Sequence, residues 1–214
     1  MKLITLFLSF LFAFSGYTIA QPNKEVSNPY AEMGQTAVLE GNFKLAASHL
    51  EKAAVADANN GDIHFTLGYS YFHSGEYAKA IGSLSKAVSL KPERANAYYY
   101  RGKARNILAT QMNSILSPLE KEKLLQAGIR DFSKCIEINA EQNMEYYQNR
   151  AMAYFDYGIL KEQKVGGTYD KVASELAYKS SINDLQHILD VNPSRKDIAD
   201  VMKKARVYLA NLNN

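Results

Sequence analysis

A spacing of 34 residues is the feature of this chain that most restricts its fold. Seven residues of a first unit, which opens near Ser27, recur 34 positions later as like residues. The first set is Tyr30, Gly34, Gly41, Phe43, Ala46, Leu50 and Ala53, and the second is His64, Gly68, Gly75, Tyr77, Ala80, Leu84 and Ala87. This register predicts a chain built from repeats.

Each half of the unit from Gly61 to Arg94 carries apolar residues at helical spacing. The first half ends at Gly75, and the second stops at Pro92. Two amphipathic helices with a glycine turn between them predict a helical hairpin, and neither helix can bury its apolar side alone. We therefore expect an all-α solenoid in which consecutive hairpins stack.

The third and fourth units are longer than the first two. Phe132 stands 48 residues after Leu84, so 14 residues have entered the third unit, and Leu185 follows Phe132 by 53. We predict that both inserts lengthen the helices, with the third turn near 113–117. The sequence SPLE, which starts at Ser117, predicts an N-cap, a proline at the first helical position and a capping-box glutamate.

Two further caps are expected near the C-terminus. Thr168 follows a glycine pair and is a candidate N-cap for the last hairpin. Ser194, with Asp197 three residues on, is a candidate N-cap for a helix that closes the open end of the stack. The predicted organisation is a signal peptide at 1–20, a flexible lead-in at 21–26, repeats at 27–60, 61–94, 95–143 and 144–193, and a capping helix at 194–214.

The first 20 residues have the three-part form of a secretory signal. Lys2 precedes the apolar run Leu3–Phe14, and small residues at Thr18 and Ala20 precede the expected cut before Gln21. The alternative is an uncleaved membrane anchor, because the apolar stretch is close to the shortest length that spans a bilayer. Either reading predicts an exported protein, periplasmic or secreted, with no membrane span after signal cleavage.

Charge and cysteine content exclude several classes of protein. Lys and Arg exceed Asp and Glu by 25 to 22, and the basic residues are interleaved with acids, which argues against a nucleic-acid partner. Cys135 is the single cysteine and stands where Ala53 and Ala87 stand in earlier units, so we expect a buried, inert thiol. The four histidines lack the spacing of a metal site and no catalytic motif occurs, so we predict no enzyme, no cofactor and no metal.

The stretch HFTLGYSYFHSGEYAKAIGSLSKAVSLKP resembles the tetratricopeptide repeat, and the unit before it is similar. Departures are Arg101 and Arg150, where a leucine is commoner, and Ala58 and Ala140, where the closing proline would stand. The resemblance implies a superhelix of four hairpins whose concave face, lined by the first helix of each unit, holds a peptide or another protein.

A second aromatic stripe marks the first helix of the second unit. It lies about 100° around the axis from the packing residues. Equivalent places in the other units hold polar and aromatic residues, and the candidate peptide-binding groove is Gln35, Phe65, Tyr69, Phe72, Tyr99, Lys103, Gln148 and Met152. The alternative is that the aromatic residues pack against the adjacent repeat. Ala31 and Gln35 open the array, so we expect no Lys and Asn clamp for a C-terminal carboxylate.

Two functions are compatible with these patterns. The first is a non-enzymatic scaffold that binds a peptide or protein partner in its groove. The second is a homo-oligomer that associates through the extended third and fourth hairpins.

Overall fold

The computed structural model describes residues 28–112, 115–139, 143–164 and 166–212, and the predicted leader and lead-in lie outside these ranges. The described residues form helices and no strand. The helices are α1 (Pro29–Leu39), α2 (Phe43–Ala56), α3 (Gly61–His73), α4 (Tyr77–Leu90), α5 (Ala95–Thr110), α6 (Pro118–Ile138), α7 (Met144–Glu162), α8 (Lys171–Val191) and α9 (Lys196–Leu212).

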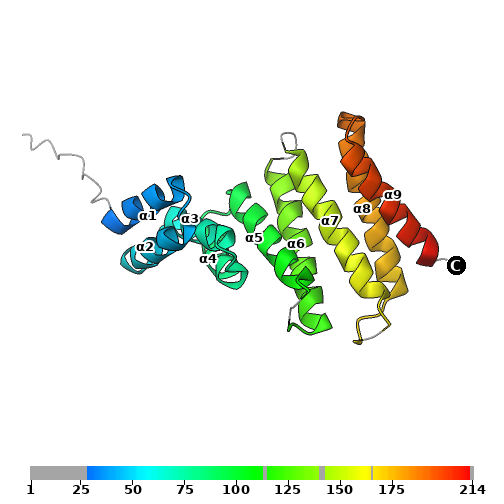
Figure 1. The fold of residues 1–214 in the computed structure, drawn as a ribbon, viewed down its shortest axis with the longest axis horizontal. Coiled ribbons are helices and arrows are strands. Elements are labelled where there is room, and N and C mark those ends of the chain that lie inside the picture. Colours follow the sequence, from blue (N-terminus) through cyan, green and yellow to red (C-terminus); the bar gives the residue numbers. More distant parts are fainter. Residues whose placement is uncertain (1–27, 113–114, 140–142, 165, 213–214) are drawn as a thin grey trace, which may run out of the picture.

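The helices stack in chain order as four hairpins and a closing helix (Figure 1), which confirms the predicted fold class. Each first helix packs on its own second helix, and each second helix packs on the next first helix. First helices of consecutive repeats also touch one another, from α1 to α3, α3 to α5 and α5 to α7. Elements on the inner side of a curved stack lie closest together, so the first helices line the inner face.

A glycine on each first helix permits the two helices of a hairpin to approach closely. A Cβ added to Gly68 would lie 2.5 Å from Cγ of Leu84, and one added to Gly102 would lie 2.9 Å from the ring of Phe132. Leu84 and Phe132 are fully buried, as the repeating stripe requires. The 34-residue register therefore reflects the packing of a large side chain against a bare backbone.

Much of each insert is helical, because the helices of the third and fourth repeats are longer than those of the second. α5 and α6 contain 16 and 21 residues, against 13 and 14 in α3 and α4. α7 and α8 contain 19 and 21. The capping box at the start of α6 is present, because the Ser117 side chain accepts from the backbone N–H of Glu120 and the Glu120 side chain accepts from that of Ser117.

Two predicted caps are wrong. α8 begins one residue after Asp170, whose side chain accepts from the backbone N–H of Ala173, while Thr168 is buried and its hydroxyl faces the Leu160 carbonyl oxygen at 3.5 Å. α9 begins at Lys196, and the Ser194 hydroxyl donates to the Asn192 side chain at 2.7 Å. The turn before α8 is two residues longer than the sequence pattern predicted, and the turn before α9 is one residue longer.

The two arginines that depart from the repeat pattern are held by buried aspartates. Arg101 donates from Nε and Nη2 to Asp131 at 3.0 and 2.6 Å, and Arg105 adds an ion pair to the same carboxylate at 2.5 Å. Nη1 of Arg101 donates to Ser85 of α4 at 3.2 Å. Arg101 therefore links its own hairpin to the preceding one.

The last helix closes one end of the stack. Ile198, Met202 and Ala205 of α9 are buried against the fourth hairpin, and the opposite side of the helix is exposed and largely charged. No helix among the described residues combines the length and the apolar character needed to span a membrane.

Candidate binding face

Tyr100 of α5 lies at the centre of an aromatic group on the first helices. Its ring centroid lies 4.9 Å from that of Tyr69, with the planes at 89°, and 5.2 Å from that of Phe72. Phe65 lies 6.5 Å away. Edge-to-face contacts of this kind are favourable and hold rings in place. We define the aromatic cluster as Phe43, Phe65, Tyr69, Phe72, His73, Tyr99 and Tyr100.

Phe43 and His73 extend the aromatic cluster to the first hairpin. The Phe43 ring, from α2, stacks on His73 at 4.7 Å and meets Tyr69 edge-on at 5.9 Å. Burial, and then the nearby charge of Lys103, lowers the pKa of His73 below its usual value. The imidazole is therefore neutral at pH 7 and packs as one more ring.

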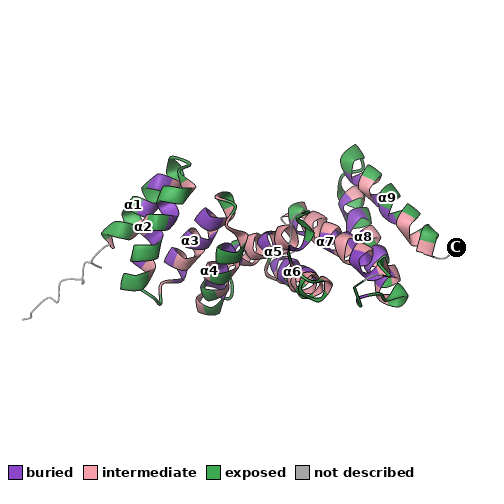
Figure 2. Ribbon diagram, turned by 60° about the horizontal axis from the view of Figure 1, so that its bottom comes forward, coloured by how far each residue is buried: buried purple, intermediate pink, exposed green. Residues whose placement is uncertain are grey.

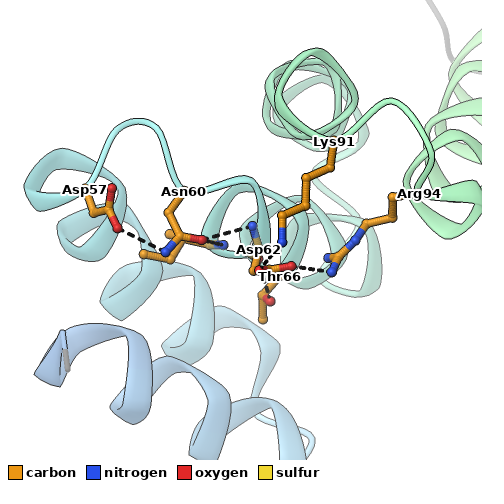
Figure 3. A network of polar contacts seen from close by, with 7 residues as sticks. Asp57, Asn60, Asp62, Thr66, Lys91 and Arg94 are labelled. Atoms are coloured by element: carbon orange, nitrogen blue, oxygen red, sulfur yellow. Dashed lines mark hydrogen bonds and ion pairs between the residues drawn. The ribbon is translucent and has the colours of Figure 1, made fainter. Parts of the chain in front are cut away.

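An ion-pair network positions one edge of the aromatic cluster (Figure 3). Asp62, in the first turn of α3, pairs with Lys91 at 2.5 Å and with Arg94. The guanidinium of Arg94 lies 4.5 Å from the ring centroid of Phe65. The hydrogen bond from Lys91 is the largest cause that lowers the pKa of Asp62, so this carboxylate stays charged and holds the arginine over the ring.

Lys103 supplies a positive charge within the aromatic cluster. Its Nζ lies 5.2 Å from the ring centroid of Tyr99 and 5.5 Å from that of Phe72, within cation–π range. The side chain is half-buried, and none of the residues that the structure describes forms an ion pair with it. A ligand on this face would meet an ammonium group that is not neutralised by a carboxylate.

Tyr99 connects the aromatic cluster to the fourth hairpin. Its hydroxyl donates to Oε2 of Glu145 at 3.0 Å, and its ring lies 5.5 Å from Tyr146 and 6.3 Å from Phe132. Burial, and then the bond to Glu145, raises the pKa of Tyr99 above its usual value. The hydroxyl remains protonated at neutral pH and acts as a hydrogen-bond donor.

The structure brings five of the eight predicted groove residues together and leaves three elsewhere. Gln35 lies exposed on α1, and Met152 lies half-buried on α7. Gln148 accepts a hydrogen bond at 3.1 Å from Arg195, close to the start of α9. The five that meet in or beside the aromatic cluster are Phe65, Tyr69, Phe72, Tyr99 and Lys103.

The aromatic residues also contact the neighbouring repeat, as the alternative prediction stated. Phe65 and Phe72 pack against the buried core of the first two hairpins, and Tyr69 contacts Tyr100 of the next first helix. These rings are nevertheless only half-buried. They combine inter-repeat packing with an accessible aromatic surface.

Sequence reasoning missed three members of the aromatic cluster. Tyr100 corresponds in register to Thr66, so comparison of the repeats gave no reason to select it. The run of tyrosines from Tyr98 to Tyr100 was the available signal. Phe43 and His73 were assigned to packing or passed over, because their role depends on how α2 lies beside α3.

The remaining reactive groups do not form a second site. Cys135 is fully buried, its Sγ donates to the Ala95 carbonyl oxygen at 3.3 Å, and burial raises the pKa of this thiol to about 12. Such a thiol is a poor nucleophile. Within the described ranges, no three residues among the histidines, cysteines and acids are grouped so that they could hold a metal ion.

Comparison with known proteins agrees with the observed fold. A family model described as a TPR repeat matches residues 68–105, which span most of the second unit and the start of the third. Over these residues the chain has the sequence of a tetratricopeptide repeat, and its described helices have the tetratricopeptide-repeat fold. A search of the curated proteins gives no match.

Several solved tetratricopeptide-repeat structures have a similar fold. "MamA MSR-1 C2" is 14% identical, with 86% of this chain and 92% of that chain covered and a TM-score of 0.57. "MamA RS-1 ArsTM double mutant" is also 14% identical, with 86% and 90% covered and a TM-score of 0.53. The first TPR of Spaghetti (RPAP3), solved with an HSP90 peptide, is 22% identical, with 58% and 87% covered and a TM-score of 0.48. At these identities the likeness concerns the fold alone.

Tetratricopeptide-repeat proteins are in general protein-interaction scaffolds and not enzymes. The fold supports many partners, and the specific function resides in the side chains of the inner face. The inner face of this chain carries the aromatic cluster and Lys103.

Proposed function

We propose that this protein is a non-enzymatic scaffold that binds a peptide or protein partner on the aromatic cluster of α3 and α5. The observation that carries the proposal is the grouping of half-buried rings around Tyr100 with Lys103 unpaired beside them. Aromatic side chains next to a cation are typical of the energetically dominant centre of protein interfaces.

The rings are held before any partner arrives. Phe43 comes from α2, Tyr69 from α3 and Tyr100 from α5, and each ring restrains its neighbours. Arg94 is fixed over Phe65 by its ion pair with Asp62. Because little side-chain motion remains to be lost, a partner can bind with a small entropic cost.

Site-specific cross-linking in the cells that make the protein tests this proposal. A photoreactive residue is placed at Tyr69 or at Lys103, and a control is placed at Val55, which is 85% exposed on α2. We expect the same partner to be cross-linked from both positions on the aromatic cluster and not from Val55. Cross-linking that is equal at all three positions, or absent at both cluster positions, would contradict the proposal.

We further propose that the protein is exported, to the periplasm or beyond the cell. The support is the basic residue, apolar run and small residues in 1–20, which lie outside the described residues. Intact-mass measurement of the exported protein should give a chain that starts at Gln21. A mass that retains residues 1–20 would indicate an uncleaved anchor.

A further inference from the structure

The two ends of the stack differ in how they are covered. α9 covers the C-terminal end, whereas none of the described residues covers the outer side of the first hairpin (Figures 1 and 2). That side contains a hollow of about 440 Å³. We call it the N-terminal face, and its principal residues are Glu32, Met33 and Glu40 of α1 with Leu45 and His49 of α2.

The N-terminal face has residues at the positions that, in the third repeat, contact the preceding repeat. Met33 and His49 occupy the register positions of Arg101 and Asp131 in the third repeat, where the arginine also bonds to Ser85 of the preceding second helix. Nδ1 of His49 is buried and has no hydrogen-bond partner among the described residues. Such an atom is costly unless a partner covers it.

The N-terminal face is also apolar and acidic. Met33 is 48% exposed and Leu45 is 43% exposed. Glu32 and Glu40 are exposed, and neither forms an ion pair within the described part of the chain. A surface that complements this face must offer apolar contact together with a positive charge.

A complementary surface lies on the extended hairpins. A pocket of about 310 Å³ opens between α6, α7 and α8, and we call it the outer pocket. Tyr154, Tyr157, Ile129 and Leu176 provide its apolar lining, and Arg130 is the charged residue that lines it among the described residues. Leu176 is 59% exposed, and Arg130 forms no ion pair in the described ranges.

Charge complementarity favours this pairing over the pairing of two like surfaces. In the stack, α3, α5, α7 and α9 each pack on a preceding second helix, and α1 alone among the described first helices lacks one. The sides of α6 and α8 that receive a following first helix are filled by α7 and α9, so α1 of a second copy would dock on the remaining outer side, where the outer pocket opens. Pairing of two outer pockets would instead bring Arg130 against Arg130 with no acid in the lining.

We propose that the N-terminal face of one copy docks in the outer pocket of a second copy. Met33 enters the apolar pocket and the carboxylates of α1 meet Arg130. The contact joins two different surfaces, so it is heterologous and extends to chains or rings. It leaves the aromatic cluster available and does not depend on the proposed partner-binding function.

Two single variants, each at an exposed position, test the proposal in the full mature protein. Met33→Glu places a charge on the N-terminal face, and Leu176→Glu places one in the outer pocket opposite the acids of α1. We expect the unmodified protein to associate beyond a dimer as its concentration rises in sedimentation, and each variant to weaken that association at least tenfold. An equimolar mixture of the two variants keeps one intact contact and should therefore form a 1:1 dimer and nothing larger.

Val207→Glu on α9 serves as the control, because Val207 is 50% exposed and lies outside both surfaces. It should associate like the unmodified protein. The proposal is overturned if the mature protein stays monomeric at about 100 µM, a concentration well above the dissociation constants of specific complexes. It is also overturned if only one of the two variants weakens the association, if Val207→Glu weakens it, or if the mixture forms no dimer.

Discussion

The guanidinium of Arg150 forms a two-point ion pair with the carboxylate of Asp184, at 2.8 Å from Nε to Oδ2 and 2.7 Å from Nη2 to Oδ1. Its Nη1 also donates to Ser133 of the preceding hairpin at 3.2 Å. The third repeat has the same arrangement around Arg101. Both extended repeats therefore have a buried ion pair at positions where the second repeat has Leu67 and Ser83.

Removal of one partner of the ion pair between Arg150 and Asp184 should strongly destabilise the fold. Asp184 is only 6% exposed, so Arg150→Leu leaves a buried carboxylate without a counter-ion. We expect a loss of about 3–5 kcal/mol in the free energy of unfolding, measured by denaturant melts.

The double variant Arg150→Leu with Asp184→Ser provides the control. It installs the residues that the second repeat has at these positions, Leu67 and Ser83. Replacement of a whole buried pair is often neutral, so we expect stability within about 1 kcal/mol of the unmodified protein. A double variant as unstable as the single one would show that the charges themselves are not the cause.

Truncation of Tyr69 to alanine tests whether its side chain packs on the surface or in the core. Tyr69 is half-buried and its ring packs against those of Phe43 and Tyr100, so Tyr69→Ala should cost about 1–2 kcal/mol. Leu84 is fully buried against Gly68, and Leu84→Ala should cost about 2–5 kcal/mol through the cavity that it leaves. Equal losses in denaturant melts would place Tyr69 in the core and remove it from the binding face.

Asp156 is expected to make stability depend on pH. Burial raises the pKa of this carboxyl above 3.8, and Asn106 donates to it at 3.0 Å. The folded state therefore binds more protons than the unfolded state, and stability falls as pH rises through the folded pKa. Asp156→Asn should be more stable than the unmodified protein at pH 7, and the difference should shrink towards pH 4.

Asp200→Asn is the matched control for this measurement, because Asp200 is exposed on α9. Its stability relative to the unmodified protein should not change with pH in the same way. If Asp156→Asn shows a constant difference from pH 4 to pH 7, ionisation of Asp156 does not contribute.

The capping box should stabilise the extended part of α6. The Ser117 hydroxyl accepts from the Glu120 N–H at 3.3 Å, so Ser117→Ala should cost about 1 kcal/mol. Amide exchange in 121–126 should be slow in the unmodified protein and faster in the variant, while exchange in α4 should not change. Rapid exchange through 117–126 in the unmodified protein would show that this segment is not a stable helix.

Local patterns determined the hairpins and the lengths of the later helices. The pair Gly34 and Leu50 has the same spacing as Gly68 and Leu84, because in both hairpins a large side chain packs against a bare backbone. The start of α6 was predictable from Ser117 to Glu120, since a capping box satisfies backbone donors within four residues. Each of these features involves residues of one helix or one hairpin. The relative position of such residues is set by their separation in the sequence.

Only the tertiary structure decided which side chains meet between hairpins. Tyr100 of α5 meets Tyr69 and Phe72 of α3, and Arg101 of α5 reaches Ser85 of α4. The caps near Thr168 and Ser194 were misplaced for a related reason, because long turns are shaped by the helices that they join. Comparison of one repeat with the next reports equivalent positions, whereas these contacts join positions that are not equivalent.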